Sequence, residues 1–125
     1  MYNRGIRGAT TVSRNEETEI LEATASLLKE IVVRNEIVPE DIGSVWITVT
    51  PDLDATFPAR AIRALSGWDM VPLMCSTEIP VKGGLAKCIR LLVQVNTNKG
   101  QREMIHVYLN GAQILRPDLS VSEPQ

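Results

Sequence analysis

The chain has little of what metal centres, nucleic-acid binding and membrane insertion require. Its 125 residues include two cysteines and one histidine, too few for a structural zinc site built from Cys and His ligands. No apolar run approaches the roughly 18 residues of a membrane-spanning helix, so no membrane partner is expected. The net charge is -2, whereas phosphate binders carry a basic surplus, so nucleic acid is not expected to be a partner.

The N-terminal residues also lack the marks of an exported protein. Residues 1–12 contain no basic head followed by an apolar stretch and a small-residue cleavage site. Cys75 and Cys88 are therefore expected to stay reduced, as is usual in the cytosol. The sequence predicts a cytoplasmic single domain over 1–125, with a polar tail from about 120 to 125 that frays.

The pattern of apolar residues predicts an α+β fold with a mixed β-sheet. Period-2 alternation and β-branched residues indicate strands, while one long amphipathic stripe and one segment between Pro58 and Gly67 indicate helices. The Asn110-Gly111 pair is typical of a β-hairpin turn. In chain order the expected elements are a strand over 4–12, a helix over 16–35, a strand over 44–50, a short helix over 58–66, and strands over 71–75, 88–95, 105–109 and 112–115.

The long helix is expected to be a packing element without chemistry of its own. Ser13 or Asn15 is predicted to cap its N-terminus, ahead of acidic residues that suit the positive end of a helix. One long helix and one short helix cannot cover both faces of such a sheet. Part of the sheet is therefore expected to be buried by partner subunits, for example in a symmetric ring. The apolar stripe consists of Ile20, Thr24, Leu27, Leu28 and Ile31.

The segment 74–90 contains the residue with the strongest chemical requirement. In the strand that follows its glycine pair, Ile89 and Leu91 share one face, and Arg90 and Leu92 share the other. A guanidinium in such an apolar run is costly unless an anion from the protein or from a ligand meets it. Arg90 is therefore predicted to bind an anion, and Arg is well suited to planar carboxylates.

Most other candidate residues have an ordinary structural interpretation when they are considered one at a time. Arg60 and Arg63, three residues apart, would normally form a solvated helix face. Cys75 would be a small core residue. Tyr108 would be a core aromatic with its hydroxyl at the rim, and His106, on the same strand face, is interpreted as structural.

Several segments of the chain, taken together, resemble one known family of enzymes. The segments RGIRGATTV, TPDLDATFPARAIR, PLMCSTEIPVKGGLAKCIR, HVYL and LRPDLS resemble the monofunctional, barrel-type chorismate mutases in order and spacing. The resemblance implies a homotrimer whose sheets form a central pseudo-barrel, with active sites between adjacent subunits. It also implies conversion of chorismate to prephenate in aromatic amino-acid biosynthesis, part of the shikimate pathway, with no cofactor and no metal.

The resemblance further implies which residues would carry the reaction. Arg90 would stabilise negative charge on the ether oxygen, Arg7 and Tyr108 would hold a carboxylate, and Glu78 would accept a hydrogen bond from the ring hydroxyl. Arg60 stands where members of the family have lysine. One subunit would contribute Arg7, Met74, Cys75, Glu78, Arg90 and Tyr108, its neighbour would contribute Phe57, Ala59, Arg60 and Arg63, and Leu115 and Arg116 would close the cleft.

The chemistry of chorismate agrees with a chain that lacks a triad, a phosphate loop and a metal-ligand cluster. Its rearrangement is unimolecular and moves no proton, so restraint of the flexible arm and a well-placed cation can be sufficient. Two alternatives use a related trimeric scaffold. One is an imine-deaminase-like enzyme, for which only Glu78 could help to activate water; the other is a sensor that binds a small anion without converting it.

Overall fold

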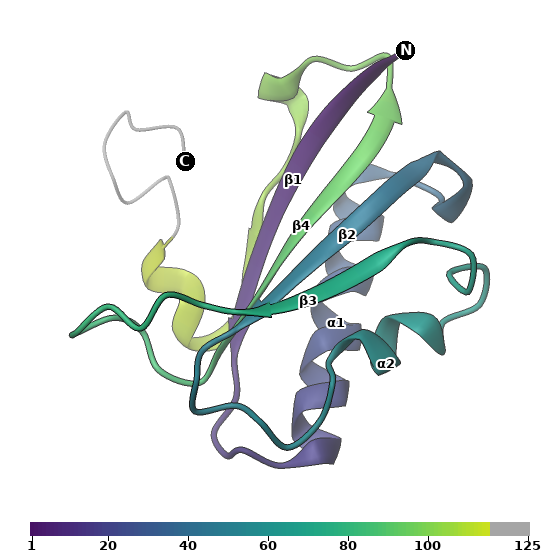
Figure 1. The fold of residues 1–125 in the computed structure, drawn as a ribbon. Coiled ribbons are helices and arrows are strands. Elements are labelled where there is room, and N and C mark those ends of the chain that lie inside the picture. The colour runs from purple at the N-terminus through teal and green to yellow at the C-terminus, as the bar shows by residue number, and fades with distance from the viewer. Residues whose placement is uncertain (116–125) are drawn as a thin grey trace.

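The computed structural model describes residues 1–115, which form a five-stranded mixed sheet with one long helix across one face (Figure 1). The predicted α+β class is confirmed for this chain, whereas the predicted tail over 120–125 lies outside the described residues. The strands lie in the order β3-β2-β4-β1-β5, so β4 is central. The strands are β1 (Tyr2–Thr11), β2 (Ile42–Val49), β3 (Leu73–Thr77), β4 (Cys88–Thr97) and β5 (Val107–Tyr108).

Strand direction decides which residues become neighbours. β4 pairs antiparallel with β1 on one side and with β2 on the other, whereas β3 runs parallel to β2 and β5 runs parallel to β1. Residues from the N-terminal strand β1 and the late strand β5 therefore meet at one edge of the sheet. Within the described part of the chain, no helix is long and apolar enough to cross a membrane.

Helix α1 (Glu17–Asn35) has the predicted length but a different N-terminal cap. Glu16 is the N-cap residue, and its side chain accepts a hydrogen bond from the backbone N–H of Glu19 at 3.3 Å. Ser13 instead binds the Glu19 carboxylate, and Asn15 accepts two backbone N–H bonds from the loop before the short helix, at 3.0 and 3.1 Å. The predicted cap is wrong because both of these side chains have partners other than the free N–H groups of the first turn.

The apolar stripe of α1 is buried against the sheet, as predicted. Gly8 on β1 lies at the closest approach, because a Cβ there would come within 2.6 Å of Ile31 Cδ1 and 3.2 Å of Leu27 Cδ1. A larger residue at this point would force the Ile31 and Leu27 side chains to shift within a close-packed core. The five predicted stripe residues, Ile20, Thr24, Leu27, Leu28 and Ile31, are all fully buried.

The short helix α2 (Ala59–Arg63) is shorter than the predicted segment 58–66. Pro58 is its N-cap residue instead of its first helical residue. Beyond the helix the backbone tightens into three-residue turns, with the Leu65 N–H donating to the Ile62 carbonyl at 3.0 Å. Gly67 then takes a positive φ of 88° and turns the chain away, as expected for a glycine just after a helix.

The predicted hairpin at Asn110-Gly111 is wrong. Strand β5 before the pair is parallel to β1, and the pair itself begins a 3-10 helix, Asn110–Leu115. Asn110 takes a φ of 53° and its side-chain amide donates to Thr10 Oγ1 at 3.0 Å, while the Gly111 N–H donates to Thr11 Oγ1 at 2.9 Å. Because both residues of the pair bind the end of β1, the chain folds onto the sheet edge and forms no second hairpin strand.

The face of the sheet opposite α1 remains uncovered among the described residues. Trp46, Met74 and Leu92 lie on this face and are 45%, 57% and 38% exposed. Arg7 and Arg90 share it, because they alternate with the buried residues of β1 and β4. We call this surface the open face of the sheet. One layer of helices therefore covers one side only, as the sequence predicts.

Candidate active site

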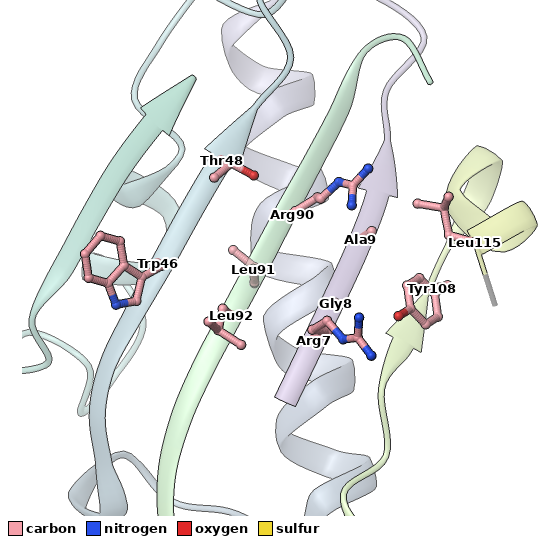
Figure 2. Close-up of a pocket in the computed structure, with 10 residues that line it drawn as sticks. All are labelled: Arg7, Gly8, Ala9, Trp46, Thr48, Arg90, Leu91, Leu92, Tyr108 and Leu115. Carbon is pink, nitrogen blue, oxygen red and sulfur yellow. The ribbon is translucent and has the colours of Figure 1, made fainter. Parts of the chain in front are cut away.

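A cavity of about 350 Å³ lies on the open face. Four of the predicted site residues, Arg7, Arg90, Tyr108 and Leu115, line this cavity (Figure 2). Arg116, which was predicted to close the cleft, lies outside the described residues. The remaining wall is formed by Gly8, Ala9, Trp46, Thr48, Leu91 and Leu92.

Arg7 and Tyr108 come from neighbouring strands although about a hundred residues separate them in sequence. Tyr108 pairs with Ala9 in the parallel register of β5 and β1, which brings it beside Arg7. The Arg7 Nη2 atom is buried and has no hydrogen-bond partner among residues 1–115. A buried guanidinium nitrogen without a partner is costly, so this atom marks a place where an anionic ligand would be stabilised.

His106 joins the same two elements. Its Nδ1 atom accepts the backbone N–H of Arg7 at 2.9 Å. Burial, together with the nearby charge of Arg7, lowers the pKa of His106. A neutral imidazole can accept this hydrogen bond, whereas an imidazolium would face the N–H with a second donor. The structural interpretation of His106 is therefore confirmed, and the contact holds the Tyr108 segment beside Arg7.

Arg90 and Glu78 form an ion pair at the edge of the cavity. The distance from Arg90 Nε to Glu78 Oε2 is 3.2 Å, and the Thr48 hydroxyl donates to the same Oε2 atom. The backbone N–H of Glu78 donates to the Val49 carbonyl at 2.8 Å, which anchors the residue just after β3. The prediction that Arg90 needs an anion is therefore met within the chain, while half of its side chain (49%) stays exposed to a ligand.

Glu78 lines a second cavity of about 500 Å³, and Arg90 lines both cavities. Asp52 forms part of this second wall. Burial raises the pKa of Asp52, but hydrogen bonds from Thr50 and from the backbone of Lys87 outweigh that effect, and the net pKa is lowered. The ionised Asp52 accepts the Lys87 N–H at 3.0 Å and so anchors the chain just before β4 begins, three residues ahead of Arg90.

The two cysteines are placed as core residues in the single chain. Cys75 is half-buried and packs against the main hydrophobic core, and Met74 beside it is exposed on the open face. Cys88 is fully buried, and burial raises the pKa of its thiol despite the nearby Arg90 charge, which lowers it. Neither Met74 nor Cys75 lines the first cavity, so their predicted contact with substrate stays a prediction.

The predicted residues of the α2 region lie away from the cavity of their own chain. Phe57 is 70% exposed, whereas Ala59 is buried. Arg60 is paired with Glu17, with 2.6 Å between Arg60 Nη1 and the carboxylate Oε2. Arg63 is exposed. This arrangement is compatible with the prediction that the segment reaches the site of a neighbouring subunit.

Six cavity residues were not predicted from the sequence, and Trp46, Thr48 and Leu92 are three of them whose side chains lie on the open face. A signal for them was present, because alternation in β2 puts Trp46 and Thr48 opposite the buried Val45 and Ile47. Alternation within one strand does not show which strand pairs with which. Only the register that sets Thr48 opposite Arg90 brings these side chains to the site.

Comparison with known proteins agrees with this geometry. The family model of chorismate mutase type I matches residues 3–119. Chorismate mutase AroH of Bacillus subtilis is 50% identical over 123 residues, covering 98% of this chain and 97% of that protein. Chorismate mutase AroH of Thermus thermophilus is 43% identical over 121 residues, covering 96% of this chain and 98% of that protein.

A solved structure leads to the same family. The chorismate mutase from Clostridium thermocellum is 52% identical and matches this fold with a TM-score of 0.85, covering 88% of this chain and 97% of that one. A family match over nearly the whole chain, together with two relatives that are aligned along almost their full length, shows that this protein belongs to the type I chorismate mutases, which are isomerases.

Proposed function

We propose that this chorismate mutase, which converts chorismate to prephenate in aromatic amino-acid biosynthesis, binds its substrate on the open face between Arg7 and Arg90. The observation that carries the proposal is the pair of arginines on one cavity wall, one of them with a buried nitrogen that lacks a partner among the described residues. Chorismate has two carboxylates, a ring hydroxyl and an enolpyruvyl ether. Arg7 can bind one of these carboxylates, Arg90 can face the ether oxygen, and the Glu78 carboxylate can accept a hydrogen bond from the ring hydroxyl.

The reaction breaks an ether C–O bond while a C–C bond forms, and no proton is transferred. The enzyme can therefore accelerate it by holding the enolpyruvyl arm over the ring in the compact reactive geometry. It can also place positive charge where electron density gathers on the ether oxygen. Arg90 suits the second role because its guanidinium stays charged and presents several donors in a plane.

The remaining side chains orient the substrate. Arg7 and Tyr108 hold the enolpyruvyl carboxylate, and Leu115 covers it from the end of the 3-10 helix. Glu78 accepts a hydrogen bond from the ring hydroxyl and balances the positive charge that develops on the ring. In this proposal Glu78 does not transfer a proton.

We further propose a homotrimer with its clefts between subunits. The support is the apolar open face, with Trp46, Met74 and Leu92 exposed together, since apolar patches of this kind mark contact surfaces. Phe57 and Arg63, both exposed and neither of them lining the cavity of their own chain, would reach the cleft of the neighbour. Buried Ala59 would support this segment, while Met74 and Cys75 would border the cleft, and Arg116 would close it.

Two finer points belong to the same proposal. Arg60 is held by Glu17 in an ion pair, which argues for a role in fixing the α2 region rather than in contacting substrate. The proposed location is the cytoplasm, where the free thiols of Cys75 and Cys88 would stay reduced.

The first test is to mix the purified protein with chorismate, follow the loss of its ultraviolet absorbance and identify the product as prephenate. We expect rapid loss, and we expect the Arg90→Ala variant to abolish it. Saturable binding without turnover would contradict the proposal and would favour the sensor. Water-dependent release of a different product would favour the imine-deaminase-like enzyme.

The shared cleft has a separate test by subunit mixing. Arg90→Ala and Arg63→Ala proteins are each expected to have low activity. If each cleft takes Arg90 from one subunit and Arg63 from the next, co-refolded mixtures contain some intact clefts, and activity should rise above that of either variant. Mixtures that stay as inactive as their components would show that the cleft is not shared.

A further inference from the structure

Thr48 occupies a position beside the reacting groups that the proposed mechanism leaves without a role. It lies opposite Arg90 in the antiparallel register of β2 and β4, and it lines the cavity. We propose that Thr48 is a positioning residue whose hydroxyl holds one oxygen of the Glu78 carboxylate, so that the other oxygen is free for the ring hydroxyl of the substrate. This inference rests on the orienting function proposed for Glu78.

The hydrogen-bond pattern around Glu78 supports this proposal. Both protein donors, the Thr48 hydroxyl and Arg90 Nε, use the same oxygen, Oε2. None of the hydrogen bonds within residues 1–115 uses Oε1. The carboxylate is therefore held on one side by the protein, and its second oxygen remains an available acceptor.

The position of Glu78 in the chain means that its side chain needs such a support. It follows β3 directly and begins a largely exposed segment that includes Gly83 and Gly84. Its backbone is anchored by the bond to the Val49 carbonyl, but that bond does not select a side-chain rotamer. Thr48 and Arg90 are the only side chains within the described residues that form a hydrogen bond or an ion pair with the carboxylate, and Thr48 is the neutral one.

The Thr48 hydroxyl also affects which donors of Arg90 remain available to the substrate. If the hydroxyl of Thr48 is removed, Arg90 remains as the only side-chain donor to Glu78 within the described part of the chain. A carboxylate released on one side tends toward a two-bond pair with a guanidinium. Such a pair would occupy the donors that are proposed to act on the ether oxygen. Thr48 therefore keeps one oxygen of Glu78 available to the ring hydroxyl of the substrate, and it keeps the terminal donors of Arg90 available to the ether oxygen.

The test replaces the hydroxyl without changing the shape of the residue. Thr48→Val keeps a β-branched side chain that suits a strand but removes the donor. We expect kcat to fall by roughly tenfold with little change in KM, the size expected for one hydrogen bond to a charged group. Thr48→Ser keeps the hydroxyl and should recover most of this loss, a rescue that a purely structural role would not produce.

Ser44→Ala is the matched control. Ser44 is on the same strand, and its hydroxyl donates across to Gln94 on β4 at 2.7 Å, but it does not line the cavity. This variant also removes a β2 hydroxyl that donates to a side-chain oxygen of another element, and it should keep normal kcat and KM. An equal loss in Ser44→Ala and Thr48→Val would assign the effect to the sheet and would overturn the proposal.

A double-mutant cycle with Glu78→Ala separates the proposal from the function on which it rests. If Thr48 acts through Glu78, Thr48→Val should have no further effect in the Glu78→Ala background. Additive losses would mean that Thr48 contacts the substrate directly, and unchanged activity in Thr48→Val alone would remove its role. Normal activity of Glu78→Ala alone would instead refute the proposed function of Glu78.

Discussion

Replacing Arg90 with lysine tests the central cation without removing its charge. In the structure, Arg90 Nε lies 3.2 Å from Glu78 Oε2, which leaves the two terminal nitrogens of the guanidinium for the substrate. A lysine has one terminal nitrogen and a compact charge. If the lysine nitrogen binds Glu78, it cannot also bind the ether oxygen of the substrate. If it binds the ether oxygen, Glu78 is left without its ion-pair partner. We therefore expect Arg90→Lys to lose most of its activity.

The expected loss can be estimated from the geometry. The variant keeps a positive charge in the cavity but cannot bind Glu78 and the ether oxygen together. Loss of one donor aimed at developing negative charge typically costs about 3 kcal/mol, or about a hundredfold in rate. The loss should appear in kcat and in kcat/KM alike, because the interaction strengthens only in the transition state.

The assay is the initial rate of chorismate loss at several substrate concentrations, with the oligomeric state and the unfolding midpoint measured on the same samples. Arg14→Lys is the matched control, because the Arg14 side chain is 73% exposed, pairs with Glu16 and Glu19 at the N-terminal end of α1, and does not line the cavity. It should keep normal activity. Near-normal turnover in a folded Arg90→Lys protein of unchanged oligomeric state would refute the reasoning.

Three further outcomes follow from the structure. Glu78→Gln should keep more activity than Glu78→Ala, since an amide oxygen can still accept the hydroxyl; equal kcat/KM losses would instead point to the charge itself. The pKa of His106 is lowered from 6.5, so its neutral form stabilises the fold above about pH 6.5, and this contribution is lost as the pH falls through the folded-state pKa. Urea midpoints should fall over this window in the parent protein and less in His106→Asn, which retains an acceptor; identical pH profiles would contradict this. Gly8→Ala should lower the free energy of unfolding by about 1–3 kcal/mol because its Cβ would meet Ile31 Cδ1 at 2.6 Å, while Gly100→Ala, which meets nothing within 4 Å, should not; equal urea midpoints would refute the close approach.

Regular periodicity explains which parts of the fold were predictable. The stripe of α1 and the alternation in β4 depend on residues a few positions apart, and backbone geometry translates that spacing directly into faces. Alternation alone therefore places Arg90 correctly on the face opposite Ile89 and Leu91. Segments without a period are placed less well, and Asn110-Gly111 is the clearest case.

The Asn110-Gly111 pair shows how a distant contact can override a local preference. Locally the pair favours a turn between two strands. In the fold its amide and N–H groups find acceptors on Thr10 and Thr11, a hundred residues earlier in the chain. The pair itself becomes the start of a 3-10 helix, Asn110–Leu115, on the sheet edge. The residues around Asn110 and Gly111 in sequence cannot show that those threonine hydroxyls lie nearby in the fold.

The sequence by itself determined the α+β class, the orientation of Arg90, and, through its resemblance to a known family, the chemistry. The tertiary structure alone decided how the candidate site is assembled. The order β3-β2-β4-β1-β5 brings Arg7 beside Tyr108 and sets Thr48 opposite Arg90. It also places Glu78, just after β3, where its carboxylate contacts both Thr48 and Arg90. The physical reason is that side-chain direction follows from neighbouring residues, whereas strand order depends on contacts between residues far apart in the chain.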